Sequence, residues 1–168
     1  MSTRSQNEKK FGQWEELPVG GRRYRLDLAG RLGWLARYLK EVDANEITVR
    51  FWQEIYDDQG KLAETHEKFP VDKGHKKVQD ATMTITKQTV ADQIAAYLHH
   101  EITLAQLVDW AERALMDGEL ADRDVKTLSS VIARLGLADV RAFGLAWDDC
   151  EELLHKLGFS PRVEVVSV

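Results

Sequence analysis

The residues best suited to chemistry lie together between His66 and Lys77, in the segment HEKFPVDKGHKK. This segment holds two imidazoles, His66 and His75, and a carboxylate, Asp72. An imidazole can donate or accept a proton near neutral pH, and ammonium groups can stabilise the charge that develops on a phosphate in the transition state. The combination suits metal-independent cleavage of RNA, with His66, His75 and Asp72 as candidate catalytic residues.

Basic side chains accompany these groups. Lys73, Lys76 and Lys77 lie in the same segment, and Arg22 and Arg25 belong to an earlier basic cluster. Such clusters can attract phosphate, so these five residues are candidate RNA contacts, although a basic cluster can also be an ordinary solvated surface. The spacing of the nearby histidines and carboxylates matches no known set of metal ligands, so the sequence predicts neither a metal nor a cofactor.

The composition narrows the class of protein. The chain has 168 residues, a net charge of −5 and 43% hydrophobic residues, which suits one ordinary domain or two small ones. No apolar run reaches the length of a membrane span, and the first ten residues are polar, so we expect a cytoplasmic protein. The single cysteine, Cys150, fits a reducing compartment. It stands among four carboxylates, which disfavour a thiolate nucleophile.

The charge is unevenly distributed along the chain. Residues 1–80 carry 15 basic and 14 acidic side chains, whereas residues 81–168 carry 8 basic and 14 acidic ones. The halves therefore have net charges of +1 and −6. An acidic second half could screen or occupy a basic patch of the first half within one molecule.

The elements that must position the candidate residues are predicted to be strands. Residues 22–28 alternate polar and apolar side chains, and residues 47–56 are rich in β-branched and aromatic ones. Residues 61–69 follow an Asp-Asp-Gln-Gly turn as the return strand of a hairpin, while residues 34–42 fit either a strand or a helix. The simplest product is an antiparallel sheet of three or four strands.

The clearest strand, residues 47–56, is predicted to be amphipathic. Side chains at alternate positions of a strand share a face. The predicted apolar face carries Ile47, Val49, Phe51 and Ile55, and the opposite face carries Arg50, Trp52, Glu54 and Tyr56.

From residue 86 the hydrophobic period changes to that of helices. Apolar residues recur at spacings of three and four, and glycines follow the runs. Thr103 is the expected N-cap of a helix over residues 104–116, and Gly136 and Gly158 are expected to end later helices. We therefore predict an α+β protein with a sheet domain at 1–80 and an all-α bundle of four or five helices at 81–168. Residues 79–86 are the predicted linker.

Two stretches carry a resemblance to known families. Residues Arg37 and Tyr38, RFWQE at 50–54 and EKFPVDKGH at 67–75 resemble small uncharacterised bacterial domains that are similar to toxin components of toxin–antitoxin pairs. A second group resembles small helical antitoxin or immunity proteins; it comprises IAAYLHHEIT at 94–103, LVDWAE at 107–112 and GLADVRAFGL at 136–145. The resemblance implies an RNA-directed toxin-like module joined to its neutralising partner, which is a departure from the usual separate chains.

Two functions follow as expectations. In the first, the sheet domain acts on RNA as a metal-independent ribonuclease and the helical domain neutralises it. In the second, the whole chain is a non-enzymatic antitoxin, immunity or phage-encoded inhibitor protein. Its acidic helical half then binds a basic protein partner, and its sheet provides a second surface or the edge of a homodimer. Neither function involves a membrane.

Overall fold

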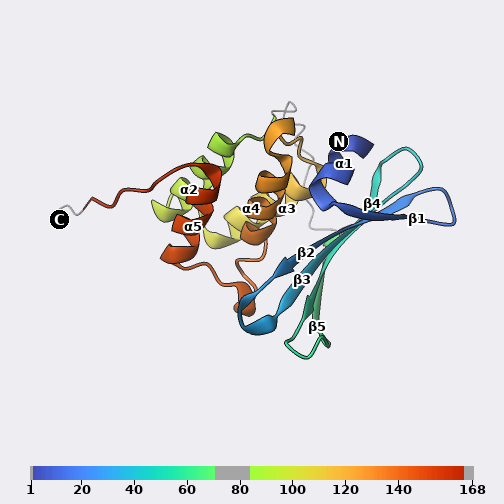
Figure 1. Ribbon diagram of the computed structural model, residues 1–168, viewed down its shortest axis with the longest axis horizontal. Helices are drawn as coiled ribbons and strands as arrows, with labels where there is room; N and C mark the ends of the chain where they lie inside the picture. Colours follow the sequence, from blue (N-terminus) through green and yellow to red (C-terminus); the bar gives the residue numbers. More distant parts are fainter. Residues whose placement is uncertain (1, 71–83, 165–168) are drawn as a thin grey trace.

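The computed structural model describes residues 2–70 and 84–164 and has an α+β architecture (Figure 1). A five-stranded antiparallel sheet near the N-terminus is followed by helices, which confirms the α+β class and the order of sheet before helices. In chain order, with η marking short 3-10 helices, the elements are α1 (Arg4–Phe11), β1 (Gln13–Glu16), β2 (Arg22–Ala29), η1 (Arg31–Gly33), β3 (Leu35–Val42), β4 (Thr48–Tyr56), β5 (Leu62–Phe69), α2 (Lys87–Leu98), α3 (Leu104–Asp117), η2 (Asp122–Asp124), α4 (Val125–Leu135), η3 (Arg141–Phe143) and α5 (Trp147–Leu157).

The strands follow one another in space as they do in sequence, in the order β1-β2-β3-β4-β5. Every neighbouring pair is antiparallel, as short connections between consecutive strands require. In the turn between β4 and β5, the Asp57 carboxylate accepts backbone hydrogen bonds from Gln59 and Lys61, and Gly60 has a φ of 73°. The predicted hairpin is thus confirmed, and residues 34–42 resolve to the strand β3.

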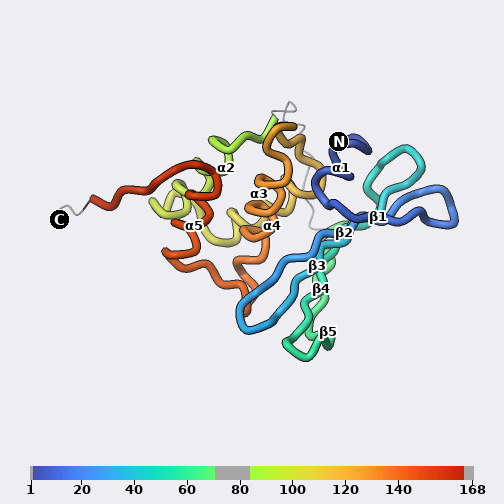
Figure 2. Tube along the Cα trace, in the orientation of Figure 1, coloured from blue at the N-terminus to red at the C-terminus, as the bar shows by residue number. Residues whose placement is uncertain are grey.

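The helices form two layers on one face of the sheet. Helices α1 and α4 pack against β2, and α3 packs against β4, whereas α2 and α5 pack on the other helices. Figure 2 shows the same layers in the Cα trace, in which α3 and α4 lie between the sheet and the helices α2 and α5. The opposite face of the sheet carries no helix among the described residues.

Local signals in the sequence account for the helix ends. Thr86 and Thr103 are the N-caps of α2 and α3, and each forms a capping box with the residue three positions later. The chain leaves α5 at Gly158, which has a φ of 90° and ends the helix in a left-handed conformation. The prediction that Thr103 begins a helix is confirmed.

Three local predictions need correction. Neither α1 nor β1 was expected, so the sheet has five strands instead of three or four. In β4, Phe51 and Ile55 are buried as predicted, but Val49 and the preceding residue Ile47 are exposed. The pairing of β3 with β4 is irregular between Glu41 and Val42, which breaks the expected alternation at this end of the strand.

Buried residues from both halves form a single hydrophobic cluster. The sheet contributes Tyr38, Phe51 and Ile55, and the helices contribute Ile94 and Leu128 among others. Most of the predicted linker, residues 79–86, falls outside the described residues. The proposed division at residue 80 stays a prediction, and the shared core leads us to expect that the halves unfold together.

None of the described helices is long and apolar enough to cross a membrane.

Candidate functional site

The predicted site residues are only partly covered by the described structure. Asp72, Lys73, His75, Lys76 and Lys77 lie outside the described residues. His66 lies within β5, inside the strand predicted at residues 61–69, and its Nε2 atom is 2.9 Å from a carboxylate oxygen of Glu64.

The structure does not bring Arg22 and Arg25 together. They are three residues apart in β2, so their side chains point to opposite faces of the sheet. Arg22 lies on the helix side and pairs with Glu8 and Glu16, at 2.6 and 2.5 Å. Arg25 lies on the uncovered face and pairs with Asp27.

The covered face of the sheet is unusually polar for a buried surface. Tyr38, Lys40 and Gln53 are each fully buried. The Tyr38 hydroxyl donates to the carbonyl of Ala133 at 3.1 Å, and the Gln53 amide donates to the carbonyl of Gly136 at 3.2 Å. Their hydrogen-bond partners therefore belong to the helical half.

Two buried ammonium groups meet the C-terminal end of α3. Lys40 Nζ donates to the carbonyl of Met116 and lies 3.2 Å from Asp117 Oδ1. Lys10 Nζ donates to the carbonyl of Gly118 at 2.9 Å and to the Ser2 hydroxyl at 2.7 Å. The last carbonyls of a helix carry partial negative charge, so this end of α3 attracts cations. Burial lowers the pKa of Lys40, and burial together with the charge of Lys40 lowers that of Lys10 well below its usual value.

A further cation of the sheet reaches α3 at its middle. Lys68, on β5, lies 2.5 Å from the Glu112 carboxylate, and both side chains are mostly buried. The Gln53 amide donates to the same carboxylate at 3.3 Å. Burial raises the pKa of Glu112 even though the charge of Lys68 opposes that shift.

Ion pairs between the halves share one polarity. In every such pair among the described residues, the cation comes from the first half and the carboxylate from the second. The pairs are Lys9 with Asp122, Arg31 with Asp149, Lys40 with Asp117, and Lys68 with Glu112. The basic side chains of the first half thus pair with the acidic side chains of the second half where the sheet meets the helices. Of the four carboxylates that flank Cys150, Asp149 takes part in these ion pairs.

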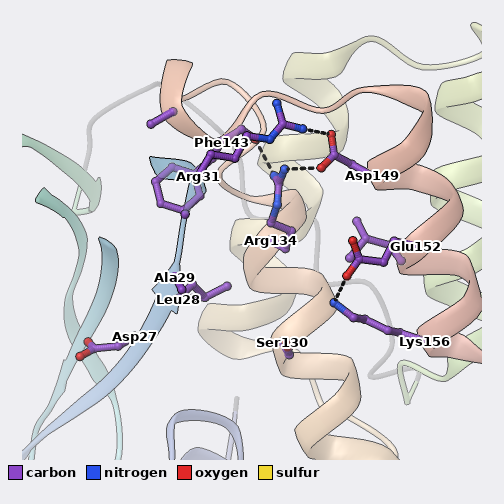
Figure 3. Close-up of a pocket in the computed structure, with 13 residues that line it drawn as sticks. Asp27, Leu28, Ala29, Arg31, Ser130, Arg134, Phe143, Asp149, Glu152 and Lys156 are labelled. Atoms are coloured by element: carbon purple, nitrogen blue, oxygen red, sulfur yellow. Dashed lines mark hydrogen bonds and ion pairs between the residues drawn. The ribbon is translucent and has the colours of Figure 1, made fainter. Parts of the chain in front are cut away.

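A cleft of about 450 Å³ lies between the end of β2 and helices α4 and α5. Figure 3 shows Arg31 and Arg134 converging on Asp149 in this cleft. Asp149 lies 2.6 Å from Arg31 and 3.2 Å from Arg134, and it also accepts a hydrogen bond from the backbone N–H of Ala146. Arg134 donates to the carbonyl oxygens of Phe143 and Gly144 as well. These groups hold the start of α5 against the sheet, so the cleft is better explained as a structural junction than as a ligand site.

The uncovered face of the sheet carries a second groove, of about 470 Å³. Arg23, Arg25 and Arg37 line it beside the rings of Trp14 and Trp52. Arg50 lies next to the groove, with its guanidinium 4.1 Å from the centroid of the Trp52 ring. Carboxylates neutralise these arginines: Arg25 and Arg37 share Asp27, and Arg50 pairs with Glu67. Burial alone would raise the pKa of Asp27, but hydrogen bonds from its two arginines outweigh burial and lower the pKa to about 2.

Stability is expected to depend on pH through Lys10. Because its folded pKa is lowered, the unfolded chain binds more protons than the folded one between that pKa and 10.5, and the free energy of unfolding rises with pH there. The slope for one proton is at most about 1.4 kcal/mol per pH unit. Urea unfolding at pH 7 and pH 9 measures it, and Lys10→Met should flatten the rise.

The range above pH 9 is unsuitable for this measurement. Burial raises the pKa of Cys150 to about 11 and that of Tyr24 to about 12, and both shifts make stability fall as the pH increases further. An equal rise from pH 7 to pH 9 in wild type and Lys10→Met would contradict the assignment to Lys10.

Sequence reasoning missed Lys40 and Gln53 as members of a site. Their only sequence signal is a polar residue at an inward-facing position of a strand, which looks the same as an ordinary solvated position. The described segments contain no group of three or more histidine, cysteine, aspartate or glutamate side chains placed to hold a metal ion. Comparison with models of protein families, with curated proteins and with solved structures finds no match to this chain.

Proposed function

We propose that the chain is a toxin–antitoxin-type module of the cytoplasm. Residues 1–80 form an RNA-directed, toxin-like sheet domain whose activity is metal-independent cleavage. Residues 81–168 form a neutralising bundle of four or five helices. The observation that carries the proposal is the common polarity of the ion pairs between the halves, with cations on the sheet side and carboxylates on the helix side.

Carboxylates and phosphates are alternative partners for the same cations. Lysine and arginine bind both through charge-assisted hydrogen bonds, so a helix that places carboxylates on a cationic face competes with a nucleic acid for it. Glu112 and Asp117 of α3 occupy Lys68 and Lys40 in this way. The helical half thus takes the positions that phosphates would need.

The burial of Lys40 supports a role beyond packing. Its side chain is fully buried, and replacing a buried ion pair by apolar residues of similar volume is often neutral or stabilising. A sheet face that only packs against helices would therefore be at least as stable with an apolar residue at this position. A lysine at this position suits a face that binds phosphate when the helices dissociate from it.

Separate expression of the two halves tests the proposal. Residues 1–80 and 81–168 are placed under independently inducible promoters in a bacterial host. Circular dichroism of purified residues 1–80 checks whether the sheet folds without the helices that share its core. Folded residues 1–80 are expected to arrest growth and degrade cellular RNA, since nothing then competes for their cations. Co-expression of residues 81–168 should restore growth, and the two chains should purify together.

A charge-reversed helical half provides the control. Residues 81–168 with Glu112→Lys and Asp117→Lys should rescue growth less well, because both carboxylates contact the sheet. The matched variant Asp92→Lys, Glu101→Lys makes the same change in charge at exposed positions outside α3 and should rescue like wild type. If the two chains purify together and residues 1–80 are folded alone but spare both growth and RNA, the toxin proposal is wrong.

That last outcome would favour the second candidate, a non-enzymatic antitoxin, immunity or inhibitor protein. The uncovered sheet face supports it, since tyrosine and arginine are enriched at protein–protein interfaces. This face holds Tyr56, Arg37 and Arg50 around the buried ring of Trp52, and its arginines are neutralised by carboxylates. A neutralised face suits a protein partner, or a second copy in a homodimer, better than RNA.

A further inference from the structure

Strand β5 carries a carboxylate, an imidazole and an ammonium group at alternate positions. Glu64, His66 and Lys68 occupy alternate positions of β5, so their side chains share one face of the strand. The contact of Lys68 with Glu112 of α3 shows that this is the face turned towards the helices. Alternate residues of a strand are about 7 Å apart, a span that a single nucleotide can bridge.

Glu64 orients the imidazole of His66. The Glu64 carboxylate lies 2.9 Å from His66 Nε2, and a carboxylate can only accept a hydrogen bond. The neutral imidazole therefore carries its proton on Nε2, which leaves the lone pair of Nδ1 free to accept another proton. This arrangement prepares the ring to act as a general base at Nδ1.

Lys68 is engaged by the helical half. Its ammonium is 2.5 Å from Glu112, and that carboxylate also accepts a hydrogen bond from Gln53. His66 and Glu64 remain substantially exposed, whereas Lys68 does not. The helical half thus pairs with the Lys68 ammonium and leaves the His66 imidazole accessible.

Building on the proposed function, we propose that Glu64, His66 and Lys68 form the reactive row of the sheet domain, and that Glu112 inhibits it by taking the place of a substrate phosphate. The substrate is RNA with a free 2′-hydroxyl. His66 Nδ1 accepts the proton of that hydroxyl, and the 2′ oxygen forms a bond to the adjacent phosphorus. The bond from phosphorus to the 5′ oxygen breaks, and water protonates the leaving oxygen.

The products are a 2′,3′-cyclic phosphate and a 5′-hydroxyl end, and His66 returns its proton to solvent. Lys68 stabilises the charge on the non-bridging oxygens while the phosphorus is five-coordinate. Glu64 is a positioning residue, because it acts through His66.

The test uses the full chain and a short single-stranded RNA with a fluorophore and a quencher at its ends. Glu112→Gln keeps the shape of the side chain but removes its charge, and should raise the cleavage rate about 10-fold, as competition for Lys68 weakens. In that background, His66→Ala and Lys68→Met should each lower the rate about 100-fold. Glu119→Gln, at an exposed position just after α3, is the matched control and should leave the rate unchanged.

A second measurement isolates Glu64. Nitrogen-15 chemical shifts of the His66 ring report its tautomer, and the wild-type chain should carry the proton on Nε2. Glu64→Met removes the acceptor and should lower the population of Nε2–H, whereas Glu64→Asp should retain part of the Nε2–H preference. An unchanged tautomer in Glu64→Met would overturn the positioning role.

The outcomes separate this inference from the function on which it rests. Cleavage of RNA by the full chain, with no gain in Glu112→Gln and no loss in Lys68→Met, would overturn the row but leave the proposed function standing. Absence of cleavage by both the full chain and its Glu112→Gln variant would overturn both. Equal cleavage of a fully 2′-deoxy version of the substrate would overturn the 2′-hydroxyl mechanism.

Discussion

Replacing Phe143 by alanine is expected to destabilise both halves of the chain together, by about 3–5 kcal/mol. Phe143 belongs to the helical half and is almost fully buried. Its ring packs over Gly30 of the sheet half, where an added Cβ atom would come within 2.5 Å of the ring. Removing the ring leaves a cavity at the junction, so the sheet and the helices both lose packing.

Native-state hydrogen exchange measures this effect in each half. Backbone amides of β3 and of α4 should lose protection by the same free energy, because they share one core. Val163→Ala, at a strongly exposed position, should change stability by less than about 0.5 kcal/mol. If α4 loses protection while β3 keeps it, the halves fold separately, as the change of hydrophobic period in the sequence predicts.

The sequence predicts elements well where the signals are local. The strands β2, β4 and β5 were predicted from alternation and β-branched residues, and α3 from Thr103 and its helical stripe. Each of these signals depends on neighbours within a few residues. Propensity, capping and turn chemistry act over the same range, which is why such elements can be read from one sequence.

Helix α1 could not be predicted from the sequence because it is stabilised by contacts with residues far away along the chain. Its sequence, RSQNEKKF, has no apolar stripe, so it does not resemble an amphipathic helix. It is held by polar groups: Gln6 bonds to Leu120, and Asn7 donates to Glu46. Hydrogen bonds over such separations leave no periodic pattern in the sequence.

The candidate site was only partly predictable for the same reason. His66 was identified from its chemistry, and Lys68 was noted within the basic cluster. The importance of Glu112 depends on α3 crossing β5, and no local pattern encodes that crossing. The acidic excess of the second half did predict that it would supply carboxylates to the first half, although it could not specify which ones.

Reversing the charge of Lys40 is expected to produce the largest loss of stability. Lys40→Glu would place a carboxylate against the carbonyl of Met116 and the carboxylate of Asp117. The carbonyl oxygen carries a partial negative charge and the carboxylate a full one, and the position is fully buried. The variant should therefore lose more than about 4 kcal/mol of stability and be largely unfolded. Circular dichroism and urea unfolding measure the loss.

Lys40→Met separates the charge from the volume of the side chain. Methionine fills similar space but leaves the Asn7 side chain and the Met116 carbonyl without their donor, so a smaller loss of about 1–3 kcal/mol is expected. Lys61→Glu makes the same reversal at an exposed turn and should change stability by less than about 0.5 kcal/mol. A folded Lys40→Glu variant within about 1 kcal/mol of wild type would mean that the end of α3 does not hold this ammonium. The sheet would then have no buried cation that depends on the helical half at this point, and one of the two α3 carboxylates would lose its assigned role in neutralisation.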